Sequence, residues 1–410
     1  MKSDLNRLLE ERGFAALVVA GDAEDNHPRH YLTNGAHITG GLVIQRRDAA
    51  PLLFVNPMET AEAAKSGLTV YSYYDIGYAD ILKETQGDRQ QAEIIFWARC
   101  LEKAGVGGGK IAVYGMGDLS VYIELVKRLN SAHPQYEFVG DLGLSLFDAM
   151  YVTKDTDEIA RIRSVAQRTS AVLAATWDFI AGHRAHEEMV VQADGTPLTI
   201  GAVKRFVRRA LLDRDLQDTA MIFAQGRDGG FPHSRGEDDM ALRLGQAIVF
   251  DLFPREIGGG YHHDCTRTWS IGYATPAVQQ AFNEVHEAFE VAVDSFRLNM
   301  PAKAMQEAVQ SYLESKGHPT ARSHPGTTTG YVHGLGHGVG LKIHERPLIN
   351  HLSQDTLVAG NVITIEPGVY YPERGFGVRI EDMCWIADDG QLVTLTDFHK
   401  ELVLPLKGAS

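Results

Sequence analysis

Cysteine is scarce in this sequence, and its apolar runs are short. The cysteines are Cys100, Cys265 and Cys384, which lie far apart and form no CxxC pair. So few cysteines, in an odd number, do not predict a disulfide framework and are typical of a chain kept in the reducing cytoplasm. The apolar run at residues 14–21 is too short to cross a bilayer, since a spanning helix needs about 20 residues. We therefore expect a cytoplasmic protein without a membrane partner.

Basic residues are also in deficit. The chain holds 39 Lys and Arg against 53 Asp and Glu, which gives a formal net charge of −14. Because phosphate binding needs a basic surface, this balance argues against a nucleic-acid partner. What the chain does have is size, with 410 residues of which 44% are hydrophobic. That is enough for two domains, each with its own core.

The first 150 residues alternate strand-like and helix-like segments. AALVVA and KIAVYG are typical of buried strands, whereas DRQQAEIIFWARCLEKAG and LSVYIELVKRLNSA have helical periodicity. This alternation predicts an α/β domain with a central sheet. No cluster of metal-ligating or nucleophilic residues stands out in it, so we expect a structural or specificity domain.

A helix start marks the boundary after this domain. Asp155, with Glu158 three residues later, has the spacing of a capping box, and a helical pattern continues to about Ile180. We expect one domain over residues 1–152 and a second over residues 153–410.

The second domain has a different pattern. Apolar strand-like runs are separated by Gly-rich turns, and two helical segments lie between them, at about 275–296 and 301–316. Pro301 stands just inside the second helix and Gly317 just past its end, as the end preferences of helices favour. Strands interrupted by helices in this way indicate an α+β domain.

Four acidic residues occupy strand positions where core residues are expected. Asp251 follows four apolar residues in AIVFDLF, and Glu366 ends the apolar strand VITIE. Asp264 in YHHDCTRTW and Glu381 in GVRIEDM are the other two. A buried carboxylate is costly unless it is paired or binds a metal. Since clustered carboxylates repel each other unless cations neutralise them, the four together predict a carboxylate-rich metal site.

A hairpin is expected to bring the two aspartates together. The connecting segment PREIGGG has the composition of a hairpin loop, so Asp251 and Asp264 are predicted on neighbouring strands. Alternation along the second strand then puts Asp264 and Thr266 on one face and Cys265 on the other. Cys265 is therefore not expected to be a ligand.

The segment YVHGLGHGVGLKIHERP, residues 331–347, carries three histidines and four glycines. His333 and His337 have the i, i+4 spacing of a zinc-binding helix. Each glycine, however, costs a helix about 1 kcal/mol relative to alanine. An extended segment or tight loop is favoured instead, in which glycines let the backbone approach a site closely.

Taken in chain order, Asp251, Asp264, His337, Glu366 and Glu381 resemble the ligand set of the pita-bread metallopeptidase family. The branch concerned contains prolidase (Xaa-Pro dipeptidase) and aminopeptidase P. The motifs DCTRTW, HGLGHGVGLKIHE, ITIEPGVY and GVRIED carry the resemblance over most of residues 150–410. The N-terminal half is similar to the creatinase-type domain of the same branch. The resemblance implies an α/β N-terminal domain, an α+β pita-bread catalytic domain and a homodimer.

The same resemblance implies two divalent ions per subunit, about 3–4 Å apart. Asp251 would chelate one ion, His337 and Glu366 the other, and Asp264 and Glu381 would bridge both. One imidazole among four carboxylates favours Mn(II), with Co(II) and Zn(II) as alternatives. A hydroxide between the ions would attack the peptide bond, and Glu366 would shuttle a proton to the leaving nitrogen.

Further histidines gain roles from this resemblance. His344 would donate a hydrogen bond to the tetrahedral intermediate. His233, in GFPHSRG, and His333 would contact the substrate. The alternative for each is an ordinary loop histidine without a function.

The full ligand set and the N-terminal domain favour hydrolysis of the bond before proline over methionine aminopeptidase or creatinase activity. A dipeptidase needs a cation for the free carboxylate of its substrate, and arginine suits that task. The candidates are Arg374, whose Gly-rich turn could lean over the cleft, Arg346 in HERP, and Arg379, which would share the face of Glu381. We expect an Xaa-Pro dipeptidase. An aminopeptidase P acting on longer Xaa-Pro peptides and a non-catalytic peptide-binding protein of the same fold are the alternatives.

Overall fold

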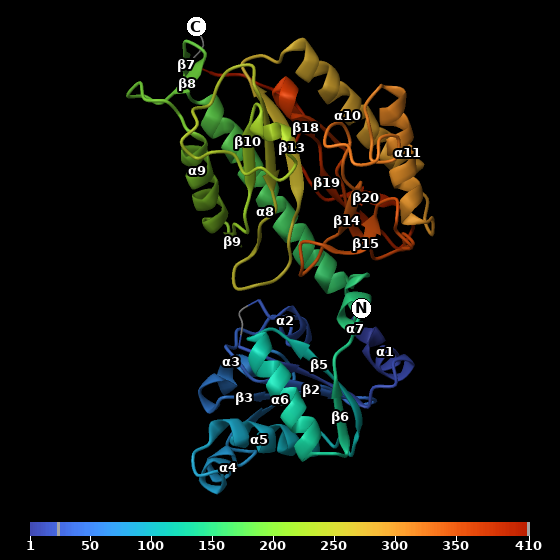
Figure 1. Ribbon diagram of the computed structural model, residues 1–410. Coiled ribbons are helices and arrows are strands. Elements are labelled where there is room, and N and C mark those ends of the chain that lie inside the picture. Colours follow the sequence, from blue (N-terminus) through green and yellow to red (C-terminus); the bar gives the residue numbers. More distant parts are fainter. Residues whose placement is uncertain (23–24, 408–410) are drawn as a thin grey trace. The chain divides into compact units, whose positions relative to one another are not determined.

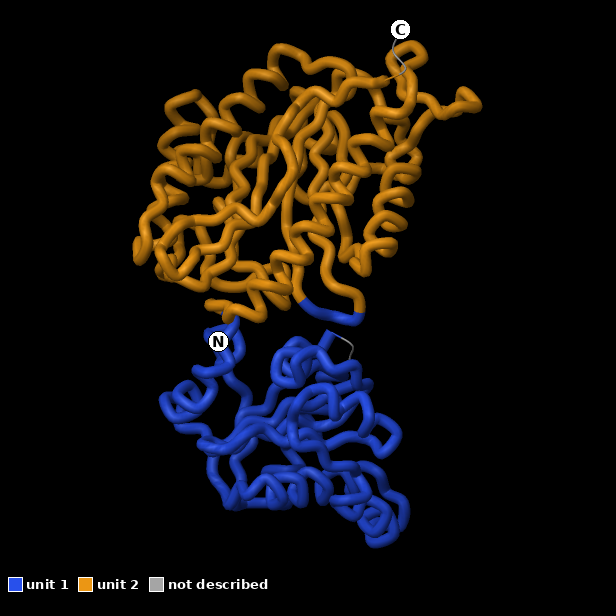
Figure 2. The backbone as a smooth tube through the Cα atoms, turned by 180° about the vertical axis from the view of Figure 1, so that it is seen from behind, with its two compact units in different colours: residues 1–151, 258–260 blue, residues 152–257, 261–410 orange. Residues whose placement is uncertain are grey.

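The computed structural model describes residues 1–22 and 25–407 of the chain. Within these ranges, no helix has both the length and the apolar character needed to cross a bilayer. Figure 2 shows two compact units, which are residues 1–151 with 258–260, and residues 152–257 with the chain from 261 onwards.

The first unit is a mixed six-stranded sheet with helices packed on it (Figure 1). Its strands are β1 (Ala16–Ala20), β2 (Leu42–Arg46), β3 (Leu52–Val55), β4 (Thr69–Ser72), β5 (Gly109–Gly115) and β6 (Tyr136–Val139). The strand order is β4-β3-β2-β1-β5-β6, in which β1 pairs antiparallel with β2 and parallel with β5. The helical segments are η1 (Lys2–Asp4), α1 (Leu5–Glu11), α2 (His27–Leu32), η2 (Pro57–Glu59), α3 (Thr60–Ala64), α4 (Tyr78–Glu84), α5 (Arg89–Lys103), α6 (Leu119–Ala132) and α7 (Leu146–Tyr151).

The core of this unit follows from the alternation of side chains along β1. Ala16 and Val18 point to the same face of the sheet and join a buried cluster with Phe96 and Trp97 of α5. The α5 helix begins at Asp88, whose carboxylate accepts hydrogen bonds from backbone N–H groups of the first turn. The predicted alternation of strands and helices is confirmed.

The second unit holds two main sheets. Its strands are β7 (Arg184–His186), β8 (Met189–Val191), β9 (Leu216–Gln217), β10 (Ile222–Gln225), β11 (Ala247–Leu252), β12 (Arg255–Glu256), β13 (Cys265–Ile271), β14 (Gly336–Gly338), β15 (Glu345–Ile349), β16 (Val362–Ile365), β17 (Gly368–Tyr371), β18 (Phe376–Arg379), β19 (Asp382–Ile386), β20 (Leu392–Thr394) and β21 (Val403–Leu404). The main sheets have the orders β10-β11-β13-β21 and β15-β14-β16-β19-β20. Short two-stranded sheets pair β7 with β8, β9 with β12, and β17 with β18.

Helices pack on the outer sides of these sheets (Figure 1). The helical segments are α8 (Thr156–Ala181), α9 (Ile200–Leu212), η3 (Asp228–Gly230), α10 (Pro276–Ser295), α11 (Ala302–Ser315) and η4 (Pro372–Arg374). Helices α8 and α9 contact each other, as do α10 and α11. The predicted capping box of α8 is confirmed, since Asp155 and Glu158 each accept the backbone N–H of the other. The two helices predicted after it in the second domain are confirmed as α10 and α11.

The two main sheets meet beside β13. A β-bridge joins Thr266 of β13 to Glu381, which comes directly before β19. Apolar residues of β16, β18 and β19, such as Ile363, Val378 and Ile386, pack in one core with α10 and α11. The strand ends that carry acidic residues are thereby held against a rigid, buried framework.

Candidate metal centre and active site

Strands β11 and β13 place the two aspartates of the site close together. They pair antiparallel with Asp251 opposite Thr266, and Asp264 comes directly before β13. The predicted hairpin is therefore confirmed. The Thr266 hydroxyl donates to a Glu381 carboxylate oxygen at 2.7 Å, so the face of Asp264 and Thr266 is the one that looks into the site. Cys265 lies on the opposite face of the strand, as predicted.

The two glutamates lie just past the ends of strands. Glu366 follows β16, and its backbone N–H donates to the carbonyl of Leu335 at 2.8 Å. Glu381 is the second residue after β18, and its backbone N–H donates to the carbonyl of Thr266 at 3.0 Å. These backbone contacts bring both carboxylates to the place where the aspartates lie.

His337 is the imidazole at the centre of this group. It lies on β14, an extended segment, so the expectation of an extended rather than helical stretch is confirmed. A Cβ on Gly336 would lie 2.1 Å from the carbonyl oxygen of Thr364, so only glycine permits this approach of the strands. The Nε2 of His337 is 3.6 Å from Asp264 and 3.5 Å from Glu366.

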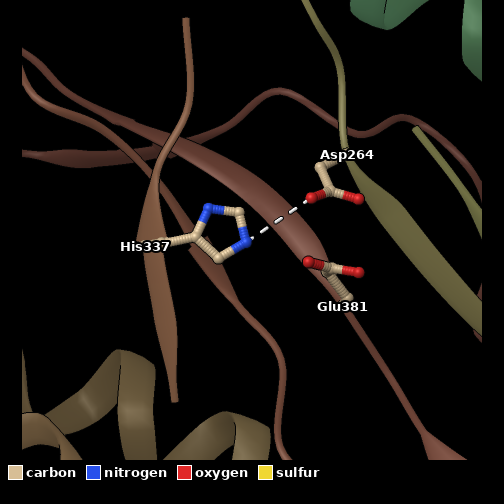
Figure 3. Close-up of side chains that lie close together, drawn as sticks. All are labelled: Asp264, His337 and Glu381. Carbon is tan, nitrogen blue, oxygen red and sulfur yellow. Dashed lines mark ion pairs between the residues drawn. The ribbon is translucent and has the colours of Figure 1, made fainter. Parts of the chain in front are cut away.

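The tautomer of His337 is set by its second ring nitrogen. Nδ1 lies 3.0 Å from the carbonyl oxygen of Gly338, and a carbonyl can only accept, so Nδ1 carries the proton. The lone pair of Nε2 then points at the carboxylates, which is the arrangement of a metal-ligating histidine. Ligand atoms of Asp264, His337 and Glu381 all lie within 4.8 Å of one another. Figure 3 shows these three side chains pointing toward a common point.

Burial and mutual repulsion raise the pKa values of the acidic groups. Burial, and after it the neighbouring carboxylates, hold the pKa of Asp264 and of Glu381 well above the usual range. Burial raises the pKa of Glu366 to about 7 and also raises that of Asp251, although Arg379 opposes both shifts. Four carboxylates of this kind cannot all be ionised together in a protein that supplies so little compensating charge.

Burial acts on the imidazoles in the opposite direction. It lowers the pKa of His337 to about 3 and that of His333 to about 4, so both rings are neutral at physiological pH. A neutral imidazole is the form that binds metals. One oxygen of Asp251, Oδ1, is buried without a hydrogen-bond partner among the described residues. A neutral imidazole, four repelling carboxylates and an unsatisfied buried oxygen together fit a pair of divalent cations.

These groups line one cavity of about 490 Å³. All five predicted ligands line it, namely Asp251, Asp264, His337, Glu366 and Glu381. Apolar side chains supply much of the remaining wall, namely Ala220, Ile222, Phe253, Ile343 and Leu348. The cavity can therefore hold a small ligand that has both a polar and an apolar part.

A family model describes the part of the chain that builds this cavity. Residues 160–388 match the model of metallopeptidase family M24. The chain belongs to metallopeptidase family M24. Membership implies divalent metal ions, in agreement with the acidic group around His337.

Curated relatives of this M24 chain include two dipeptidases by name. The "Probable dipeptidase PepE" of Mycobacterium tuberculosis is 29% identical over 266 residues, which is 65% of this chain and 64% of that protein. The Xaa-Pro dipeptidase of Pyrococcus furiosus is 31% identical over 256 residues, which is 62% of this chain and 65% of that protein. The chain therefore matches just under two thirds of the length of these relatives.

A solved structure extends the likeness to the whole chain. The X-Pro aminopeptidase of Thermotoga maritima aligns with a TM-score of 0.74 at 21% identity, over 95% of this chain and 97% of that one. At this identity the likeness shows the fold. The predicted fold class is confirmed: an α/β N-terminal domain precedes an M24 pita-bread catalytic domain.

The three other predicted histidines of the M24 site all line the cavity. The ring centroid of His344 lies 4.4 Å from that of His337, at an interplanar angle of 78°. His333 donates from Nδ1 to the carbonyl of Gly334 at 2.7 Å, which leaves Nε2 to accept from the hydroxyl of Tyr370 at 2.9 Å. His233 is exposed to the cavity from the loop after η3. Their positions agree with contact to a substrate, and their roles stay predictions.

Arg379 lies in the wall of the cavity, buried, as the alternation with Glu381 predicts. Its Nη2 donates to Asp251 at 2.6 Å, and its Nε donates to the hydroxyl of Thr266 at 3.0 Å. Its Nη1 donates to the hydroxyl of Tyr370 at 2.8 Å and to the carbonyl of Pro232 at 3.2 Å. The guanidinium thus orients a metal-site carboxylate and braces the neighbouring loop.

The other two predicted arginines do not line this cavity. The expectation that Arg374 leans over the cleft is wrong, because its guanidinium stacks 4.7 Å from the ring centroid of Tyr371 and 5.0 Å from that of Phe376. Arg346 makes an ion pair with Asp355 at 2.5 Å and lines a neighbouring cavity instead.

Sequence reasoning missed two residues of the site, Tyr370 and Arg235. Tyr370 links Arg379 to His333 through its hydroxyl, but in the apolar run ITIEPGVYY nothing marks it as polar in role. Arg235 lines the cavity. Its place two residues after His233, in the same loop, could have singled it out.

Proposed function

We propose that this chain is a dinuclear metal-dependent peptidase that hydrolyses the bond before proline, most readily in Xaa-Pro dipeptides. The observation that carries the proposal is the convergence of Asp251, Asp264, His337, Glu366 and Glu381 on one cavity of an M24 chain. The named activities of its curated relatives, a probable dipeptidase and an Xaa-Pro dipeptidase, support the dipeptide as substrate.

The five acidic and imidazole groups would hold two ions. Asp251 would bind one ion, His337 and Glu366 the other, and Asp264 and Glu381 both. Oxygen-rich donors with one nitrogen favour Mn(II), with Co(II) or Zn(II) as alternatives. When bound, such ions neutralise the carboxylates and activate a water molecule as the nucleophile.

The protein's own groups would position the peptide and move the proton. Glu366, which lines the cavity and would bind one of the ions, would take a proton from water and pass it to the leaving nitrogen. His344 would donate a hydrogen bond to the oxygen on which negative charge develops, and His233 and His333 would contact the peptide. The apolar wall of the cavity suits a proline ring.

Cleavage of longer Xaa-Pro peptides is the second candidate, and the likeness in fold to an X-Pro aminopeptidase supports it. A homodimer in the cytoplasm stays our prediction for the assembly and location. The cysteines are free and buried, in keeping with a reducing compartment.

Replacing one bridging ligand tests the proposal. Asp264→Asn removes a charge that both ions would share, so bound metal and the release of proline from alanyl-proline should both fall, hydrolysis by more than ~100-fold. The measurements are metal content after loading with Mn(II) and the rate of proline release. The wild type should hold about two ions per chain.

Asp388→Asn is the matched control, since Asp388 is an exposed carboxylate after β19 that does not line the cavity. Full metal content and turnover in the Asp264→Asn variant would show that the ligand assignment is wrong. A wild type that holds two ions without cleaving peptides before proline would instead indicate a peptide-binding protein.

A further inference from the structure

The cavity has a charge requirement that the residues discussed so far do not meet. Its lining carboxylates are those of Asp251, Asp264, Glu366 and Glu381, and two divalent cations would balance them. A dipeptide also brings a free carboxylate, which needs a cation of its own because an unpaired buried charge is costly. The arginine side chains that line the cavity are those of Arg235 and Arg379, and no lysine among the described residues lines it.

Arg379 already makes hydrogen bonds to other groups of the protein. Four of its five N–H groups are used by Asp251, Thr266, Tyr370 and the carbonyl of Pro232. A guanidinium so engaged, and buried, cannot turn toward a ligand without leaving Asp251 unpaired. It therefore stabilises the wall of the cavity rather than the end of a substrate.

The backbone of Arg235 is held by hydrogen bonds, whereas its side chain pairs with none of the described residues. The N–H of Phe223 in β10 donates to its carbonyl, and the N–H of Ser234 donates to the carbonyl of Phe231. Gly236 follows with φ +73°, where a Cβ would lie 2.2 Å from the carbonyl oxygen of Phe223, so the turn is tightly held. The guanidinium of Arg235 is exposed at the cavity, and none of the residues that the structure describes pairs with it.

Asp238, an acidic residue near Arg235 in the sequence, is paired with another cation. Asp238, three residues later, accepts from the Nζ of Lys204 at 2.7 Å. Lys204 also donates to the carbonyl of Gly236 at 3.2 Å, which fixes the same turn. Since none of the described residues pairs with the guanidinium of Arg235, its positive charge is available at the cavity.

We propose that Arg235 binds the C-terminal carboxylate of the peptide and so selects a dipeptide over an amide or a longer chain. This role rests on the proposed hydrolysis before proline, and it makes Arg235 the residue that distinguishes a dipeptide from a longer peptide. The planar guanidinium can bind a carboxylate through two parallel hydrogen bonds, a geometry that lysine or glutamine cannot offer.

Hydrolysis of alanyl-proline and alanyl-prolinamide by the Mn(II)-loaded protein tests this role. The two substrates differ in the carboxylate alone. The wild type should prefer the acid. In Arg235→Gln the preference, as the ratio of the two kcat/KM values, should fall by roughly 10- to 100-fold, the value of a charge-assisted hydrogen bond. The loss should come from a higher KM for alanyl-proline, with hydrolysis of the amide unchanged, and Arg235→Lys should restore part of it.

Arg227→Gln is the matched control, since Arg227 lies on the same loop, is exposed and stacks on Phe231 outside the cavity. An unchanged ratio in Arg235→Gln, or an equal loss on both substrates, overturns the role of Arg235 while the hydrolysis before proline stands. A wild type that cleaves neither substrate overturns the proposed function, and the role of Arg235 with it.

Discussion

At the residue scale, Asp264 and Glu381 are buried and each lies close to other carboxylates. Protonation is one way to relieve this repulsion, and cation binding is the other. The raised pKa of Glu366 and the lowered pKa of His337 have the same physical origin, since burial disfavours the charged form of both. We therefore expect the buried carboxylates to lower the free energy of unfolding of the metal-free protein.

Glu366→Gln makes that cost measurable in metal-free protein. The pKa of Glu366 is about 7 when folded and 4.5 for an ordinary glutamate, so between these values the unfolded chain ionises while the folded protein keeps its proton. Stability contributed by Glu366 is complete below pH 4.5 and is lost as pH rises toward 7. The free energy of unfolding of the wild type, relative to that of Glu366→Gln, should therefore fall between pH 4.5 and about 7. Above pH 7 the difference between the two proteins should stay constant.

Thermal unfolding of both proteins with excess chelator, at intervals from pH 4.5 to 8, is the measurement. Glu290→Gln, an exposed carboxylate on α10, is the control. A difference between wild type and Glu366→Gln that does not change with pH would contradict a raised pKa for Glu366.

At the element scale, the segment that carries His344 is held by a buried ion pair. Lys154, just before α8, donates to Glu345 at 2.7 Å, and the two side chains are 1% and 2% exposed. Glu345 also accepts the backbone N–H of Lys342 at 3.0 Å, which closes the loop around His344. A pair so completely buried sets the position of the loop more than it adds to overall stability.

Lys154→Met should therefore be costly in two ways. It leaves the Glu345 carboxylate buried without its partner, which costs about 3–5 kcal/mol of folding free energy. It also releases the loop, so kcat for alanyl-proline should fall. Lys407→Met is the control, because its pair with Asp178 is 69% and 68% exposed and is worth less than about 1 kcal/mol. Equal stability and kcat in both variants would exclude a positioning role for Lys154.

The sequence predicted the elements whose signals are local. Helix α8 was recognisable from Asp155 and Glu158, and the acidic strand ends were recognisable because a carboxylate interrupts an apolar run. Arg374 was misplaced because its stacking on Tyr371 depends on a turn that periodicity does not describe. Arg235 was missed for a similar reason, since the cavity that it faces forms only when β10, β14 and β18 come together.

At the scale of the whole molecule, the chain joins an α/β unit to an M24 unit, and the family match lies in the latter, over residues 160–388. The same fold carries both a named X-Pro aminopeptidase and named Xaa-Pro dipeptidases among the proteins similar to this chain. Fold alone therefore does not decide substrate length, and the side chains that line the cavity must do so.

We propose that the chain is a metal-dependent Xaa-Pro dipeptidase. The most direct test compares kcat/KM of the Mn(II)-loaded protein for alanyl-proline and for alanyl-prolyl-glycine. We expect cleavage of both bonds before proline to depend on the metal, with the dipeptide cleaved faster. Faster cleavage of the tripeptide would make the protein an aminopeptidase instead, and no cleavage of either would contradict the proposed activity as a whole.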